Sequence, residues 1–227
     1  LTGTPMSIQL ENLVKAGSGG GGNEIPDGKL VNIYLAGDST VKTYGPTSDT
    51  GGWGEYLQSY FYSDKVKVVN YANGGRSSRS FINEGSLNKI ASTIKNGDYL
   101  MIQFGHNDSS NQQGYLVERF VSVGEPDANG IYPSTPGVKE ATPGTLTAQY
   151  GDTYYPYTSG TLKWYLQQYI DVAKAAGATP ILVTPVSRQY FNPTGTIRTH
   201  HDATDATTGT VTSSNNAYVR AVEQLGA

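Results

Sequence analysis

Three short motifs bring together residue types that could carry out nucleophilic chemistry on an acyl group. The first is Gly37-Asp-Ser-Thr40, which ends the apolar stretch that begins at Val31. If that stretch is a buried strand of a parallel sheet, the hydroxyl lies at the carboxyl end of the strand, where α/β proteins bind their ligands. Ser39 is therefore a candidate nucleophile. Asp38, Ser39 and Thr40 could instead cap a following helix, because these residue types are the preferred N-caps.

The second motif is the glycine-rich stretch Asn73-Gly-Gly-Arg-Ser-Ser-Arg-Ser80. Paired glycines let the backbone turn sharply and bring an amide close to a ligand. Preorganised donors of this kind stabilise a developing oxyanion, each by about 3 kcal/mol. An ordinary glycine turn would use the same residues.

The third motif is Gln103-Phe-Gly-His-Asn-Asp108. The carboxamide of Asn107 could donate a hydrogen bond to the same oxyanion. His106 could be a general base or a structural histidine, and its position directly beside Asn107 favours the structural role. Asp108 could cap the segment that follows.

The elements that position these motifs alternate along the chain between strand and helix. Apolar runs predict strands over 31–36, 66–72, 99–104 and 180–186, and helical periodicity predicts helices over 53–62, 80–94, 162–176 and 215–225. Ser80 is the expected cap of the second helix, and Gly177 is expected to end the third. This alternation predicts a three-layer α/β/α fold around a central parallel sheet, in which the three motifs converge on one crevice.

Two regions fall outside this alternation. Residues 1–22 contain the run Gly17-Ser-Gly-Gly-Gly-Gly22, which predicts a linker or the remnant of a preceding module, with the domain over 23–227. An insertion over 111–160 is much longer than a usual βα connection. It holds six tyrosines, at positions 115, 132, 150, 154, 155 and 157. They could form a carbohydrate-facing lid or could pack the loop onto the domain.

Composition narrows the classes of partner. The net charge is −3 and 15% of residues are charged, so the chain offers no basic surface for nucleic acid. It contains no cysteine, which excludes disulfides, cysteine metal sites and a thiol nucleophile. No apolar run approaches the roughly 20 residues of a membrane-spanning helix.

Taken together, the three motifs resemble the first three sequence blocks of the serine–glycine–asparagine–histidine (SGNH) hydrolases, and more specifically of rhamnogalacturonan acetylesterases. The stretch Gly51-Gly-Trp-Gly-Glu-Tyr-Leu57 resembles that subfamily too. The resemblance covers the chain from about residue 31 onward and implies a flavodoxin-like fold. It implies Ser39 as nucleophile, Asp38 as an orienting residue, and the Ser39 amide, the Gly75 amide and the Asn107 side chain as the oxyanion hole. It implies no cofactor and no metal.

The sequence departs from the family in one block. The family has an Asp-x-x-His near its C-terminal end, which supplies the general base, and this chain contains no such tetrad. His200 and His201 precede the last predicted helix, so we expect them in a substrate-side loop. The base, the last strand and its covering helix would then belong to a segment beyond residue 227 or to a second chain. The alternative is that one of these two histidines serves as the base.

The expected activity is removal of acetyl groups from a plant cell-wall polysaccharide, rhamnogalacturonan first, by a secreted esterase. Arg76, Arg79 and Arg188 are candidates for binding galacturonate carboxylates, although arginines in glycine-rich turns commonly have structural roles. Acetylated xylan or a small ester is an alternative substrate. A sugar-binding module that has lost catalysis is an alternative of another class.

Overall fold

The structure is a computed structural model that describes residues 30–109, 119–139, 157–186, 193–195, 203–204, 211–213 and 216–227. Its centre is a parallel sheet of four strands in the order β2-β1-β3-β6. The strands are β1 Val31–Gly37, β2 Val66–Asn70, β3 Tyr99–Gln103 and β6 Thr179–Leu182. The predicted parallel α/β fold is confirmed.

Strand β1 is central, and its side chains alternate between the two faces of the sheet. Ile33 and Leu35 belong to a small core with Phe61 and Val66, whereas Tyr34 belongs to a much larger core on the opposite face. This follows from the two-residue period of a strand. Because β1 is apolar on both faces, it requires cover on both.

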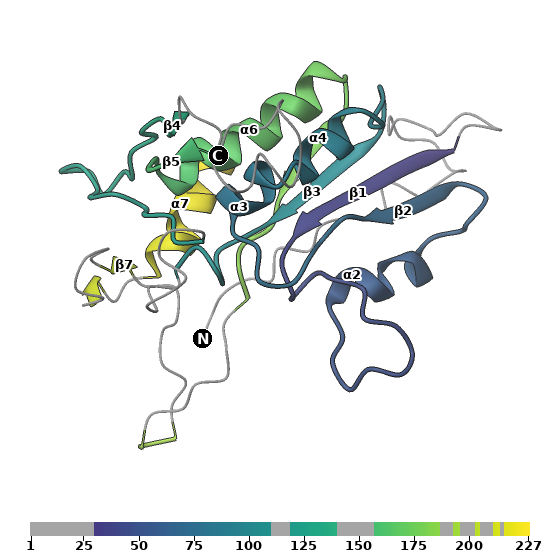
Figure 1. Cartoon of the computed structure of the whole chain (residues 1–227), viewed down its shortest axis with the longest axis horizontal. Helices are drawn as coiled ribbons and strands as arrows, with labels where there is room; N and C mark the ends of the chain where they lie inside the picture. The colour runs from purple at the N-terminus through teal and green to yellow at the C-terminus, as the bar shows by residue number, and fades with distance from the viewer. Residues whose placement is uncertain are drawn as a thin grey trace, which may run out of the picture.

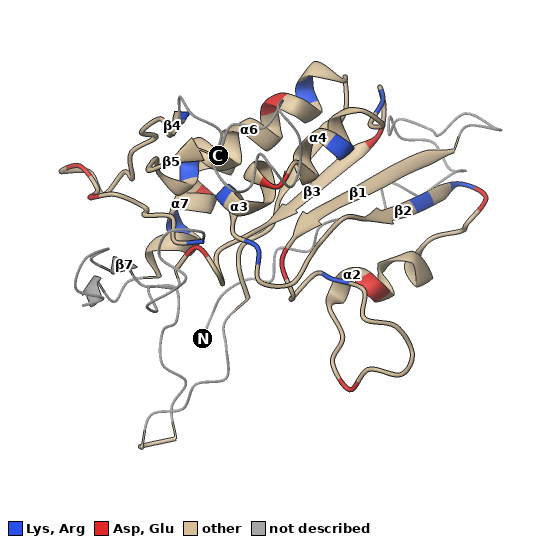
Figure 2. Ribbon diagram, viewed as in Figure 1, with Lys and Arg blue, Asp and Glu red and all other residues tan. Residues whose placement is uncertain are grey.

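Helices provide that cover (Figure 1). On the larger core lie α3 Ser78–Asn83, α4 Ser86–Ala91, α6 Leu162–Ala175 and α7 Ala217–Gly226. The short α2 Trp53–Tyr56 and the 3-10 helix η1 Leu57–Tyr60 cover the other face. Strands β1 and β3 contain no charged residue, and charge is carried by helices, loops, strand β2 and the short strand β4 Val138–Lys139 (Figure 2).

The helix predicted over 80–94 is two helices, and its predicted cap is wrong. Gly85 adopts a left-handed conformation, with φ of 77°, and ends the run between α3 and α4. Ser77 is the N-cap of α3: its hydroxyl accepts from the Ser80 amide at 3.1 Å, and its own amide donates to the Ser80 hydroxyl at 2.8 Å. Ser77 and Ser80 therefore form a capping box, in which Ser80 occupies the N3 position.

Other boundaries are close to the prediction. Helix α6 ends at Ala175, and Gly177 follows with a φ of 72°. Strand β6 ends at Leu182, four residues before the predicted limit. Helix α7 begins at Ala217 rather than at 215.

Two tyrosines of the insertion are described, and both pack onto the domain. Tyr132 is 2% exposed. The ring of Tyr157 lies edge-on to that of Trp164, with 5.3 Å between centroids. For these two residues the structure supports packing rather than a lid. The other four tyrosines lie outside the described residues, as does the predicted boundary at residue 22.

Two small antiparallel pairs complete the described elements: β4 Val138–Lys139 with β5 Tyr157–Thr158, and β7 Ala203–Thr204 with β8 Val211–Ser213. No helix within the described ranges is long and apolar enough to cross a membrane.

Candidate active site

A single tight turn follows β1 and carries Ser39. The carboxylate of Asp38 accepts hydrogen bonds from the amide and the hydroxyl of Thr40, both at 2.8 Å. The Asp38 carbonyl accepts from the amide of Lys42 at 3.0 Å. The next helix, α2, begins eleven residues after Lys42, with Gly52 as its N-cap. The helix-cap alternative for these residues is therefore wrong, because Asp38 closes the turn that presents Ser39.

Close packing explains the glycine before this turn. A Cβ at Gly37 would lie 2.5 Å from Cγ2 of Val41 and 3.0 Å from the carbonyl oxygen of Gln103. Asp38 is 1% exposed, whereas Ser39 beside it is half-buried. The turn is thus embedded in the protein while its serine remains accessible.

Gln103, the last residue of β3, forms side-chain hydrogen bonds with three other segments around this turn. Its side-chain oxygen accepts from the Thr40 hydroxyl at 3.0 Å and from Trp53 Nε1 at 2.7 Å. Its amide nitrogen donates to the carbonyl of Thr184 at 2.7 Å. Gln103 is not among the functional residues that the sequence predicts. The available signal was a polar residue at the end of an otherwise apolar buried strand.

The glycine-rich loop after β2 lies against the serine turn. The amide of Asn73 donates to the carbonyl of Gly37 at 3.0 Å, which holds the loop beside the end of β1. The Cβ of Ser39 lies 3.8 Å from the position that a Cβ on Gly74 would take. Gly75 has a φ of 77°, a conformation that favours glycine.

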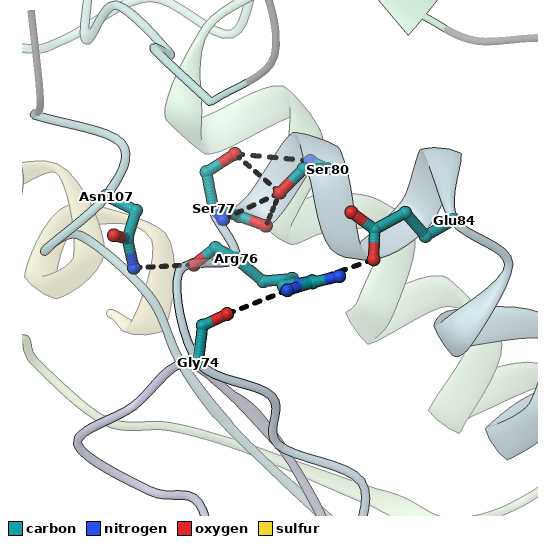
Figure 3. Close-up of polar contacts among 6 residues, drawn as sticks. All are labelled: Gly74, Arg76, Ser77, Ser80, Glu84 and Asn107. Atoms are coloured by element: carbon teal, nitrogen blue, oxygen red, sulfur yellow. Dashed lines mark hydrogen bonds and ion pairs between the residues drawn. The ribbon is translucent and has the colours of Figure 1, made fainter. Parts of the chain in front are cut away.

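Asn107 reaches the same loop from the end of β3. Its Nδ2 donates a hydrogen bond to the carbonyl oxygen of Arg76 at 3.0 Å (Figure 3). A carboxamide nitrogen carries two hydrogens, and this bond uses one of them. Ser39, Gly75 and Asn107 thus come from the ends of the three adjacent strands β1, β2 and β3 and gather at one edge of the sheet. Their catalytic roles stay predictions.

Asp108, the residue after Asn107, is fully buried. One carboxylate oxygen accepts from both the amide of Ser78, at 3.0 Å, and the hydroxyl of Ser78, at 2.5 Å. Burial raises the pKa of Asp108 to about 7, against the opposing effect of the Ser78 hydrogen bonds. Its carboxylate binds the start of α3, and residues 110–118, in the segment that Asp108 was expected to cap, lie outside the described residues.

The predicted substrate-binding arginines differ in their surroundings. The Nε of Arg76 forms an ion pair with Glu84 at 2.8 Å, and its Nη1 donates to the Gly74 carbonyl at 2.9 Å (Figure 3). Arg79 is buried, with 6% exposure. These contacts support structural roles for both residues. Arg188 lies outside the described residues.

Of the three histidines in the chain, only His106 lies within the described residues. His106 is 7% exposed, and so is largely buried beside Asn107. His200 and His201 lie outside the described residues. Within the described ranges, no group of three or more His, Cys, Asp or Glu residues could hold a metal ion.

Comparison with known protein families identifies the family to which the chain belongs. The family model for GDSL-like lipases and acylhydrolases matches residues 33–192, a range that includes Ser39, Gly75 and Asn107. The chain belongs to the GDSL-like lipase/acylhydrolase family. The predicted family resemblance is therefore confirmed.

Several relatives of this GDSL-family chain are named as rhamnogalacturonan acetylesterases. It is 38% identical over 160 residues to the probable rhamnogalacturonan acetylesterase YesY of Bacillus subtilis, a match covering 70% of the chain and 56% of YesY. It is 34% identical over 170 residues to the rhamnogalacturonan acetylesterase RhgT of B. subtilis, covering 74% of the chain and 55% of RhgT. The chain thus spans about half the length of these curated relatives.

A solved structure supports the fold of the GDSL-family chain. The crystal structure of the YxiM protein of B. subtilis superposes with a TM-score of 0.53 at 27% identity. The superposition covers 86% of this chain and 41% of the YxiM chain.

Proposed function

We propose that this protein is a serine esterase that removes acetyl groups from a carbohydrate, with acetylated rhamnogalacturonan as its substrate. One observation carries the proposal: the turn that holds Ser39 lies against the Gly74–Gly75 loop, and Asn107 is hydrogen-bonded to that same loop. A nucleophile and two kinds of oxyanion donor are the parts that acyl transfer requires. The names of the relatives supply the substrate.

In the proposed reaction, the Ser39 oxygen forms a bond to the acetyl carbon while the carbonyl π pair moves onto the acetyl oxygen. The amides of Ser39 and Gly75 and the Nδ2 of Asn107 donate to that oxyanion. When the intermediate collapses, the bond to the sugar oxygen breaks and the sugar leaves as an alcohol, having taken the proton that Ser39 gave up. Water then releases acetate from the acyl-enzyme by the same steps in the same site.

A histidine is proposed to carry the proton between Ser39, the sugar oxygen and water. The chain contains three histidines and no Asp-x-x-His tetrad. Substitution of His200 and of His201 by alanine tests whether either is this base: near-complete loss of acetate release would assign the role. Full activity in both variants would exclude both residues.

The proposed substrate indicates an extracellular location for the esterase. A cell-wall polysaccharide is too large to enter a cell, so we place the esterase outside it.

Acetate release is the test of the proposal. The chain is incubated with acetylated rhamnogalacturonan, with acetylated xylan and with p-nitrophenyl acetate, beside its Ser39→Ala and Ser63→Ala variants. Ser63 is an exposed turn serine and serves as the matched control. We expect fastest release from rhamnogalacturonan, loss in Ser39→Ala and full activity in Ser63→Ala. Faster release from xylan would change the substrate, and equal activity in both variants would overturn the mechanism.

A second candidate, of another class, is a sugar-binding module without catalysis. It predicts binding of rhamnogalacturonan fragments with no acetate release from any of the three substrates. Isothermal titration with the same chain measures that binding directly.

A further inference from the structure

The guanidinium of Arg119 lies against Gly75, the predicted oxyanion residue. A Cβ on Gly75 would come within 3.2 Å of Cζ and of Nη2 of Arg119, and within 3.3 Å of Nη1. Because these three distances are nearly equal, Gly75 meets the flat face of the guanidinium rather than its N–H edge. The N–H edges therefore extend along the surface of the loop.

The backbone beside Arg119 is held firmly. Phe120 and Val121, the two residues that follow it, are buried. The Val121 amide donates to the Asp108 carbonyl at 3.0 Å, and the Ser122 carbonyl accepts from the Leu162 amide at 2.9 Å. A cation on such a support can be placed against a ligand with little loss of conformational entropy.

Arg119 reaches the glycine-rich loop from another part of the chain, whereas Arg76 belongs to the loop and Arg79 to α3. Arg119 is half-buried and lies against Gly75, and a Cβ on the preceding Gly74 would come within 3.8 Å of the Ser39 Cβ. Ser39 and the Arg119 guanidinium thus lie beside two consecutive glycines of one loop, Gly74 and Gly75.

We propose that Arg119 binds the carboxylate of an acidic sugar in the substrate, beside the ester that Ser39 attacks. The inference rests on the proposed function, because it names a binding determinant of the same site. A guanidinium presents donors in a planar fork that matches a carboxylate, and the pair forms charge-assisted hydrogen bonds. Recognition of this kind distinguishes an acetylated uronic acid from an acetylated neutral sugar.

A cation at Gly75 could also act on the oxyanion, and the two roles predict different substrate dependence. Carboxylate recognition affects acidic ligands only. Oxyanion stabilisation affects hydrolysis of every ester, neutral ones included, and leaves the binding of deacetylated ligands unchanged.

The test measures binding, so it does not depend on turnover. Deacetylated rhamnogalacturonan oligosaccharide is titrated calorimetrically into the chain and into its Arg119→Gln, Arg119→Lys and Arg220→Gln variants. The second ligand is the same oligosaccharide with each carboxyl reduced to a primary alcohol. Arg220 is an exposed arginine of α7, so its variant controls for the loss of one positive charge.

We expect Arg119→Gln to weaken binding of the acidic oligosaccharide at least tenfold and to leave binding of the reduced one unchanged. Arg119→Lys should fall between the wild type and Arg119→Gln, because lysine keeps the charge and loses the planar fork. Arg220→Gln should bind both ligands as the wild type does.

Equal weakening for both ligands, or none for either, would overturn the proposal. So would lack of binding of the acidic oligosaccharide by the wild type. Failure of the esterase assignment has a separate signature: no acetate release from the acetylated substrates while carboxylate-dependent binding persists.

Discussion

Ser78 donates both its backbone amide and its hydroxyl to a single carboxylate oxygen of Asp108, thirty positions further along the chain. Asp108 follows Asn107, and Ser78 is the first residue of α3, so this pair joins the two loops that hold the candidate oxyanion donors. The other carboxylate oxygen is buried and has no hydrogen-bond partner among the described residues. A carboxyl group in such surroundings favours its neutral form.

This pair predicts a pH dependence of stability. The folded state raises the pKa of Asp108 from 3.8 to about 7, so between these values the native protein binds more protons than the unfolded chain. The contribution of Asp108 to the free energy of unfolding therefore falls as pH rises from about 4 to 7, by a total of about 4 kcal/mol.

Asp108→Asn tests this dependence, because asparagine retains an oxygen acceptor for Ser78 and cannot ionise. Urea unfolding of both proteins at several pH values between 4 and 8 measures the difference. We expect similar stability near pH 4 and a variant that is more stable than the wild type at pH 8. A difference that does not change with pH would contradict the assignment.

Gly75→Ala is predicted to impair catalysis more than a left-handed backbone alone would explain. The added methyl meets the Arg119 guanidinium at 3.2 Å in addition to the strain at a φ of 77°. We expect at least a tenfold loss of kcat for acetate release, since donor geometry at an oxyanion is sensitive to small shifts.

Gly130→Ala is the matched control for that loss. Gly130 has a φ of 78°, and a Cβ there would meet nothing within 4 Å. Both variants should lose about 1–2 kcal/mol of stability from backbone strain. Unchanged kcat in Gly130→Ala, with reduced kcat in Gly75→Ala, would isolate the contact with Arg119 and the local loop geometry. Equal kcat in the two variants would contradict the prediction that the surroundings of Gly75 matter for catalysis.

Gln103→Leu is predicted to destabilise the protein by about 2–4 kcal/mol, because it leaves the Trp53 indole N–H and the Thr184 carbonyl without their Gln103 partner. The Thr40 hydroxyl keeps its bond to Asp38. Urea unfolding measures the change. Gln167→Leu on α6 is the control: the Gln167 amide bonds Asp171 at an exposed position, so its loss should change stability by less than about 0.5 kcal/mol. Comparable losses in the two variants would argue against a connecting role for Gln103.

The sequence alone determined the sheet and the edge where the candidate residues gather. Strand β1 is apolar at most positions, so it must be buried on both faces, and a parallel sheet places Ser39, Gly75 and Asn107 at the carboxyl ends of adjacent strands. Family motifs of this kind are local patterns, and local patterns can be read without knowing which distant residues meet.

Only the tertiary structure decided which side chains serve these residues. The placement of Arg119 over Gly75, the three side-chain hydrogen bonds of Gln103 and the burial of Asp108 against Ser78 join residues that are far apart in the chain. Within α3, the choice of Ser77 over Ser80 as cap depended on where the chain leaves the Gly74–Gly75 loop. These contacts depend on how whole elements pack, because hydrogen-bond geometry and steric fit across the fold are not properties of any one segment.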